Sequence, residues 1–389
     1  MTAKKKATSI EKTAAEKIAA EKTAAEKTAV VLSDEEARRA NAGALLAERK
    51  LDALLVSSLH NIRYLTGFTG SNAALLLQAD GRATLFTDPR YTVQAGQQAT
   101  CRVKIAKGPL TKAVLEEMAR AKVRQVGVEA DHLTFAQYEA LAKGVPGRTE
   151  LKGQAQLIER LRMVKDGGEI AKIRASVQCN SAALEAALGR FRAGMTEAAL
   201  AAEIDHQSRK RGAEAPAFDT IVAAGARAAL PHAHPGATKI GPGILLIDMG
   251  AFRDGYASDM TRTLHVGKAT AKFRSVYKAV LEAEMAAIDA VRAGVTAASV
   301  DAAARKVLRG HGLEKQFIHS TGHGLGLEIH EPPRLGRRDK TRLEAGMAIT
   351  VEPGVYVEGW GGIRIEDTIL VTYAGCEVLT PTPKELREL

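Results

Sequence analysis

Histidine and glycine dominate one short stretch of the chain, HSTGHGLGLEIHEPP (319–333), which carries His319, His323 and His330. Histidine is a common metal ligand and an acid or base near neutral pH. Glycine lets the backbone turn sharply and approach other groups closely. The simpler alternative is a flexible loop with surface histidines. The chemical interpretation needs suitable partners elsewhere in the chain.

Acidic residues supply such partners, because they stand where a strand would bury apolar residues. Asp248 ends the apolar run ILLID, Asp259 lies in the next predicted strand, and the turn-forming FRDG separates them. If the hairpin tip falls between Arg253 and Asp254, positions 248 and 259 lie opposite each other, with Cβ atoms about 5 Å apart. Two carboxylates at that separation repel unless one is protonated or a cation lies between them. Asp254 itself is predicted to face solvent in the turn.

Two glutamates near the C-terminus repeat this anomaly. Glu352 ends the predicted strand AITVEPG, and Glu366 lies inside the predicted strand GGIRIEDTILV. Alternate residues of a strand share a face, so Arg364 and Glu366 point the same way. A simple Arg–Glu pair is the alternative, but it leaves the other misplaced carboxylates unexplained.

Four inward carboxylates and one imidazole form a ligand set for two divalent ions. An oxygen-rich site with a single histidine suits manganese, cobalt, zinc or iron. Two ions about 3.5–4 Å apart favour hydrolytic chemistry.

Elements of two kinds must position these residues. Residues 1–32 form a Lys/Ala/Glu-rich low-complexity tail. Residues 33–155 alternate predicted strands with helices and indicate an α/β domain, which starts at a helix with Ser33 as N-cap and Glu36 completing a capping box. Residues 156–389 begin with one long predicted helix from 155 to 188. Further helices over 196–211, 271–293 and 297–311, with antiparallel strands between them, indicate an α+β domain with a curved sheet covered by helices.

Composition excludes several classes of protein. The chain has 389 residues and a formal net charge of +10, but no basic stripe with interleaved aromatics predicts nucleic-acid binding. No apolar run reaches the roughly 18 residues of a membrane span. The three cysteines are widely separated, and the N-terminus lacks the apolar segment of a secretory signal. A cytoplasmic location is therefore expected.

The order of the five ligand-type residues identifies a resemblance. The segments IDMGAFRDGYASDMTRT, HSTGHGLGLEIHE, TVEPGVY and GGIRIEDTILV resemble those of the pita-bread metallopeptidases, which include methionine aminopeptidase, aminopeptidase P and prolidase. The resemblance covers about 158–380 and implies a pita-bread catalytic domain. It implies that Asp259 and Glu366 bridge two metal ions, that Asp248 holds one ion, and that His323 and Glu352 hold the other.

Further roles follow from the same resemblance. Glu352 is implied to transfer the proton of the attacking water. His319 and His330 match two active-site histidines that contact the substrate and the reaction intermediate. His232, in ALPHAHPG, matches another substrate-contacting position, whereas His234 is predicted to be a surface residue.

The proline-directed branch of the family is favoured. Tyr356 and Arg364 match positions typical of aminopeptidase P and prolidase, and YLTGFTGSNAALLL and LFTDPRYTVQA resemble the N-terminal domain of that branch. The expected activity is cleavage of the Xaa-Pro bond at the N-terminus of peptides by an Xaa-Pro aminopeptidase that uses two divalent ions. Manganese is expected, with cobalt or zinc as alternatives. A homodimer is expected, with proline-containing peptides as partners and with neither nucleic acid nor membrane.

Other functions remain open at this point. A prolidase restricted to Xaa-Pro dipeptides is the main alternative to an aminopeptidase. A metal-free creatinase-like hydrolase and a non-catalytic peptide-binding protein share the fold, but such proteins usually lose metal ligands, and here all five positions are filled. A Ser/His/Asp hydrolase is disfavoured, since no nucleophile-elbow motif is present.

Overall fold

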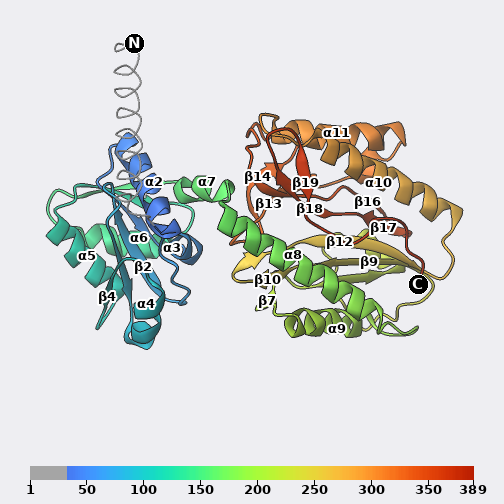
Figure 1. Cartoon of the computed structure of the whole chain (residues 1–389), viewed down its shortest axis with the longest axis horizontal. Coiled ribbons are helices and arrows are strands. Elements are labelled where there is room, and N and C mark those ends of the chain that lie inside the picture. Colours follow the sequence, from blue (N-terminus) through green and yellow to red (C-terminus); the bar gives the residue numbers. More distant parts are fainter. Residues whose placement is uncertain (1–32) are drawn as a thin grey trace, which may run out of the picture. The chain divides into compact units, whose positions relative to one another are not determined.

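The computed structural model describes residues 33–389 of the chain (Figure 1). The predicted tail over 1–32 lies outside the described residues. Two compact units divide between Ala155 and Gln156. They are called here the N-terminal unit and the second unit, and each is described by itself.

The N-terminal unit is built on one mixed sheet of six strands in the order β4-β3-β2-β1-β5-β6. The pairs β1–β5, β3–β4 and β5–β6 are parallel, and β1–β2 and β2–β3 are antiparallel. The strands are β1 (Ala53–Val56), β2 (Ala73–Gln78), β3 (Ala83–Thr87), β4 (Arg102–Ile105), β5 (Gln125–Glu129) and β6 (Glu150–Gln154).

Helices cover this sheet and complete the expected α/β organisation. Ser33 caps the first helix, and Glu36 closes the capping box, as predicted. The apolar side chains of Leu55, Phe86 and Val126 in the sheet share a core with Val114 of α5. The helices are α2 (Asp34–Glu48), α3 (Leu59–Thr66), α4 (Thr92–Gln98), α5 (Leu110–Ala121) and α6 (Phe135–Gly144), with a 3-10 turn η1 (Pro89–Tyr91).

The second unit contains two antiparallel sheets that meet at the site. One has the order β12-β9-β8, and the other has the order β14-β13-β15-β18-β19. Hydrogen bonds from Glu366 N to Thr261 O and from Thr368 Oγ1 to Asp259 O join them. The strands are β7 (Ala215–Pro216), β8 (Ile221–Ala224), β9 (Gly243–Met249), β10 (Ala251–Arg253), β11 (Tyr256–Ala257), β12 (Met260–Val266), β13 (Gly322–Gly324), β14 (Glu331–Leu335), β15 (Ala348–Val351), β16 (Gly354–Val357), β17 (Gly361–Arg364), β18 (Asp367–Val371) and β19 (Cys376–Val378).

Helices cover these sheets on two sides (Figure 1). Leu245 and Ile247 of β9 share a core with α8 and α9, whereas Leu246 belongs to the core that includes α10 and α11. Both faces of β9 are thus buried, which explains its unbroken apolar run. The helices are α7 (Leu157–Met163), α8 (Gly167–Leu188), α9 (Glu197–Lys210), α10 (Ala271–Ala290) and α11 (Ala297–Gly310), with 3-10 turns η2 (Gly225–Ala229) and η3 (Glu314–Gln316).

The single long helix predicted at the start of the second unit is wrong. The chain breaks between α7 and α8, where Val164 is extended and bridges to Met347. Asp166 then starts α8 as its N-cap, and its capping box with Glu169 satisfies the free N–H groups of the new helix. The interruption has a local cause, because Asp166 competes for these N–H groups and two glycines follow it.

Among the helices of residues 33–389, none combines the length and the apolar character needed to span a bilayer.

Candidate metal centre and active site

The first two predicted ligands come from the hairpin of β9 and β12, in a register that differs from the expected one. Asp248 pairs with Thr261, and Asp259 is not its partner. The prediction is wrong because the tip lies between Asp254 and Gly255, whose φ angles of 52° and 74° suit a tight hairpin turn. The shift changes the pairing by two residues, so Asp259 still shares a strand face with Thr261 and Asp248.

His323 lies on β13, where the neighbouring glycines permit close strand packing. A Cβ on Gly322 would lie 1.9 Å from the Thr350 carbonyl oxygen, and one on Gly324 would lie 2.2 Å from the Pro332 carbonyl oxygen. The glycines therefore allow β13 to fit between β14 and β15. This explains why glycine alternates with histidine in the sequence.

The His323 ring has a defined proton position. Nδ1 lies 2.9 Å from the Gly324 carbonyl oxygen, which can only accept, so Nδ1 carries the proton. Burial lowers the pKa of His323 to about 4, and the ring is neutral at pH 7. Nε2 therefore directs a lone pair toward Asp259 Oδ2 at 3.5 Å and Glu352 Oε1 at 3.6 Å. Lone pairs facing one another in this way repel unless a proton or a metal cation lies between them.

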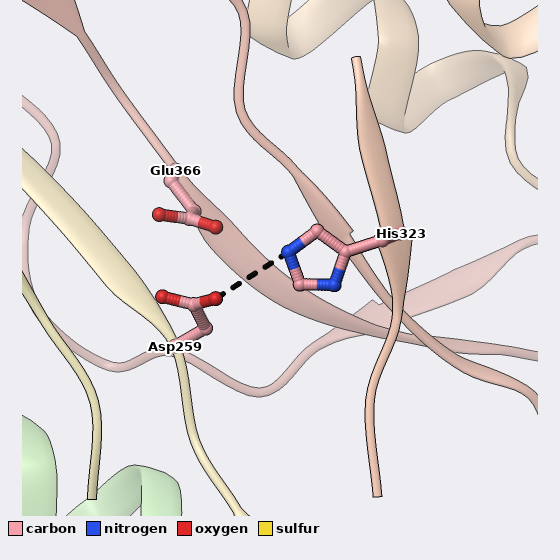
Figure 2. A group of neighbouring side chains, drawn as sticks. All are labelled: Asp259, His323 and Glu366. Carbon is pink, nitrogen blue, oxygen red and sulfur yellow. Dashed lines mark ion pairs between the residues drawn. The ribbon is translucent and has the colours of Figure 1, made fainter. Parts of the chain in front are cut away.

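Glu366 completes the tightest group of ligand-type atoms (Figure 2). It follows β17, is 2% exposed, and accepts a hydrogen bond from Thr261 Oγ1 at 2.7 Å. One ligand atom each of Asp259, His323 and Glu366 lies within 4.8 Å of the others. Of the five predicted metal ligands, these three converge most closely, and Glu352 lies beside them against His323.

The site contains more acidic than basic side chains, and divalent cations could balance this excess negative charge. Burial, followed by the charges of neighbouring carboxylates, raises the pKa of Asp259 and of Glu366 well above the ordinary values. Burial also raises the pKa of Glu352 to about 7. Arg364 neutralises Asp248 through a 2.6 Å contact to Oδ2, but Asp248 Oδ1 is buried without a hydrogen-bond partner in the described structure. The donor set thus suits hard or borderline divalent ions.

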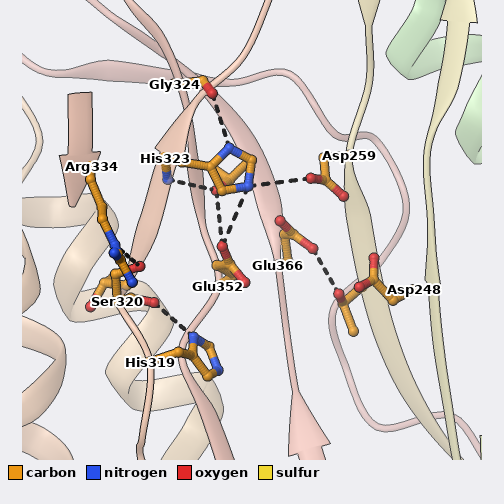
Figure 3. A network of polar contacts seen from close by, with 12 residues as sticks. Asp248, Asp259, His319, Ser320, His323, Gly324, Arg334, Glu352 and Glu366 are labelled. Atoms are coloured by element: carbon orange, nitrogen blue, oxygen red, sulfur yellow. Dashed lines mark hydrogen bonds and ion pairs between the residues drawn. The ribbon is translucent and has the colours of Figure 1, made fainter. Parts of the chain in front are cut away.

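A chain of hydrogen bonds runs from Arg364 through Tyr356 to His319, and Figure 3 shows the contact of His319 with Ser320. Arg364 Nη1 donates to Tyr356 Oη at 2.6 Å, and burial raises the Tyr356 pKa to about 12, so the phenol keeps its proton. His319 Nδ1 donates to the Ser320 carbonyl oxygen at 2.8 Å, which leaves Nε2 to accept from Tyr356 Oη at 2.9 Å. Every donor in this chain meets an acceptor, so the His319 ring is held in one tautomer.

The other predicted histidines lie at the more open side of the site. The His330 ring meets the His323 ring edge to face at a centroid distance of 4.4 Å, and its residue is exposed. His232 is exposed as well, and burial lowers the pKa of both His319 and His330. His234 is exposed, as predicted for a surface residue.

The simple Arg364–Glu366 pair, which was the alternative to a metal-ligand role for Glu366, takes a different form. The Arg364 Nε donates to Thr261 Oγ1 at 2.9 Å, and the same hydroxyl donates to Glu366. Arg364 forms its ion pair with Asp248. The two side chains do share a face, but Thr261 lies between them.

Three residues of the site were missed in the sequence. Thr261 and Thr350 hold Glu366 and the His323 backbone N–H, respectively. Each stands two positions from a predicted ligand, so strand alternation was a usable signal. Arg334 is exposed and donates from Nε to Ser320 Oγ. Burial lowers the pKa of His323 and raises the pKa of Glu352, and the charge of Arg334 adds to the first change and opposes the second. No comparable sequence signal exists for Arg334.

Comparisons with known proteins agree with this arrangement. Residues 171–373 match metallopeptidase family M24, and residues 38–164 match the creatinase/prolidase N-terminal domain. The chain belongs to metallopeptidase family M24, and the predicted pita-bread catalytic domain with a preceding α/β domain is confirmed. The protein is therefore a metallopeptidase, in the Xaa-Pro peptidase branch of the family.

Similar proteins have known or assigned activities. A curated Xaa-Pro dipeptidase of Pyrococcus furiosus is 35% identical, over 87% of this chain and 96% of that protein. The solved structure of an Xaa-Pro dipeptidase from Bacillus anthracis has a TM-score of 0.88 and 38% identity, over 91% of this chain and 100% of the other. An X-Pro aminopeptidase structure from Thermotoga maritima has a TM-score of 0.82 and 36% identity, over 88% and 99%.

Proposed function

We propose that the protein is an Xaa-Pro dipeptidase that uses two divalent metal ions. The dipeptidases among its relatives favour this activity over the aminopeptidase expected from the sequence. The observation that carries the proposal is the group of buried carboxylates facing the His323 lone pair. The residues that would hold the ions are Asp248, Asp259, His323, Glu352 and Glu366.

Bound ions would supply a water molecule of lowered pKa and would polarise the scissile carbonyl group. The side chains around them have separate tasks. Glu352, with a pKa raised to about 7, can take up a proton and return it to the leaving proline nitrogen near neutral pH. His319 stays neutral because burial lowers its pKa to about 4, so its ring positions groups through hydrogen bonds. The exposed His232 and His330 are available to contact the substrate.

Tyr356 and Arg364 act on the same side of the site. Their hydrogen bonds connect His319 to Asp248, so both are proposed to shape the pocket for the substrate. The proline nitrogen leaves as an amine when the C–N bond breaks, so it must gain a proton, and the proton that Glu352 takes from the attacking water would supply it.

A test of proton transfer compares two glutamates of the same segment. Glu352→Gln keeps the size of the side chain but cannot carry a proton, so we expect Ala-Pro hydrolysis to fall at least about a hundredfold. Glu358→Gln changes an exposed glutamate next to β16 and should keep wild-type activity. Substantial activity in the first variant would contradict the role of Glu352, provided that both variants fold.

An Xaa-Pro aminopeptidase is the second candidate, because the Thermotoga maritima structure belongs to that class. Rates of hydrolysis of Ala-Pro and Ala-Pro-Ala, measured with added manganese, cobalt or zinc, separate the two activities. A dipeptidase cleaves the dipeptide much faster, and comparable cleavage of the tripeptide would establish the aminopeptidase instead. Failure to cleave either peptide with any of these ions would refute both.

We further propose manganese as the native metal, a homodimer and a cytoplasmic location. Carboxylate-rich donor sets suit manganese. The three cysteines are free, which fits a reducing compartment. Metal analysis of the purified protein and its mass in solution test the first two proposals.

A further inference from the structure

The C-terminal segment Thr382–Leu389, called here the C-terminal strap, lies alongside β12. His265 N donates to the Arg387 carbonyl oxygen at 3.1 Å, and Leu389 N donates to the His265 carbonyl oxygen at 2.9 Å. Gly267 N also donates to the Leu389 carbonyl oxygen at 2.9 Å. The strap therefore extends the sheet that carries Asp248 and Asp259.

Arg262 connects the strap to the back of the metal centre. It lies on β12 next to Thr261, but it points to the opposite face and is 3% exposed. Its Nε donates to the Pro383 carbonyl oxygen at 3.0 Å, and Nη2 donates to the Thr382 carbonyl oxygen at 2.6 Å. Its Nη1 donates to the carbonyl oxygens of Thr261 at 3.0 Å and of Glu366 at 2.6 Å. One guanidinium thus bonds both the strap and the backbone of two site residues.

Lys384 forms a second connection from the strap. Its Nζ lies 2.7 Å from Glu284 Oε1 and also forms an ion pair with Asp367, the residue that follows Glu366. Arg262 Nη2 donates to the other oxygen of Asp367 at 2.7 Å. Glu284 and Asp367 are both 0% exposed, so losing the ammonium group would remove the cation that joins these two buried acidic groups.

These connections matter because the closest ligand-type residues come from different sheets. Asp259 precedes β12, whereas Glu366 precedes β18 in the other sheet. A cavity of about 530 Å³ lies between part of the strap and α8, lined by Leu184, Leu188 and Arg387 among others. Leu386 and Leu389 pack against the hydrophobic cores of the unit. The bonds of Arg262 and Lys384 add polar connections from the strap to the backbone at Glu366 and to the neighbouring Asp367.

We propose that the C-terminal strap is a positioning element of the metal centre. Through Arg262 and Lys384, it fixes the backbone at Glu366 relative to β12. The separation of the Asp259 and Glu366 carboxylates, and with it the affinity for metal, depends on this contact. The inference rests on the proposed two-metal function.

The test uses Lys384→Met, with Lys384→Arg as a conservative variant. Arg387→Ala is the matched control, because Arg387 lies on the same strap but pairs at the surface with Glu185. We expect Lys384→Met to bind Co²⁺ about ten- to a hundredfold more weakly, with a changed visible absorption spectrum of the bound ion. Lys384→Arg should restore most of the affinity, and Arg387→Ala should bind as the wild type does.

A second measurement needs no metal. Hydrogen exchange in the metal-free protein should accelerate in Lys384→Met over residues 361–371, and Arg387→Ala should leave that segment unchanged. If Lys384→Met does not fold, the double variant Glu284→Gln/Lys384→Met removes both charges and is measured in its place.

The outcomes distinguish the two proposals. Wild-type Co²⁺ affinity together with unchanged exchange over 361–371 in the folded variant would overturn the role of the strap. A wild-type protein that binds no Co²⁺ would overturn the two-metal function, and the exchange measurement would then decide whether the strap fixes the position of Glu366.

Discussion

Two sites of buried carboxylates, one in each unit, are arranged in opposite ways. In the N-terminal unit, Glu129 is 4% exposed, and both of its carboxylate oxygens accept hydrogen bonds. Its Oε2 accepts from the backbone N–H groups of Ser57 at 2.6 Å and Ser58 at 2.7 Å, and its Oε1 accepts from the Asn61 side-chain amide at 2.7 Å. These donors hold the start of α3 against the end of β5. Glu129 is a structural carboxylate.

The candidate metal centre of the second unit buries carboxylates against one another. Asp259 is 5% exposed and Glu366 is 2% exposed, and the charge of Glu366 helps to raise the pKa of Asp259. Burial alone therefore does not reveal a functional carboxylate. What distinguishes Glu129 from the carboxylates of the candidate metal centre is whether the buried oxygens face donors or face other acceptors.

The largest expected effect comes from Asp259→Asn. The change removes one oxygen ligand and its charge, so Ala-Pro hydrolysis should fall at least about a thousandfold, on the order of 4 kcal/mol of transition-state stabilisation. In EDTA the variant should unfold at a higher temperature than the wild type, because a repulsive charge has been removed. Activity above about a tenth of the wild-type rate would remove Asp259 from the metal centre.

The free energy of unfolding of the metal-free protein should depend on pH, because the folded state loses stability when buried carboxylates with raised pKa values ionise. The raised pKa values, about 7 for Glu352 and about 8 for Glu284, mean that the folded state holds protons that the unfolded state releases near pH 4.5. Stability is therefore lost as pH rises through the folded pKa values, by roughly 2–3 kcal/mol between pH 6.5 and 8.5. Urea unfolding in EDTA measures this slope. Glu352→Gln should flatten the slope, and a wild-type protein that becomes more stable over this range contradicts the repulsion.

Glu129→Gln should have the reverse effect of Asp259→Asn. It weakens charge-assisted hydrogen bonds that the N–H groups of α3 need, so we expect a loss of about 2 kcal/mol in the free energy of unfolding. The rate constant of peptide hydrolysis per folded molecule should stay near the wild-type value. A loss of kcat without a loss of stability would show that the distinction between the two units is wrong.

The smallest expected effect comes from Tyr356→Phe. The variant loses the hydroxyl that joins Arg364 to His319, and we expect kcat/KM for Ala-Pro to fall about tenfold, which is about 1.4 kcal/mol. Metal affinity should change little, because the Arg364 contact to Asp248 remains. Loss of bound metal in this variant would place Tyr356 in the support of the metal centre instead.

Local rules predicted much of the secondary structure. The capping box of Ser33 and Glu36 lies within one helical turn, and the structure contains it. The break before α8 follows a similar rule, since Asp166 and Glu169 form a capping box that the sequence already contained. The apolar residues on both sides of this break led to the prediction of one continuous helix in place of α7 and α8.

The hairpin of β9 and β12 shows where local reasoning ended. Its strands were predicted, but their register depends on which two residues adopt positive φ, and Asp254 and Gly255 do so. A shift of two residues kept Asp248 and Asp259 on one face. It also placed Thr261 opposite Asp248, between Arg364 and Glu366.

The sequence by itself determined which residues are able to do the chemistry, because a carboxylate in an apolar strand is recognisable from its immediate neighbours. It also determined where most helices start and the division into an α/β N-terminal unit and an α+β second unit. Only the tertiary structure decided which oxygens face His323, which threonines hold them, and that the C-terminal strap bonds to the back of the site. These contacts join residues that lie 104 to 120 positions apart in the sequence. They depend on strand register and side-chain packing, which a short stretch of sequence does not specify.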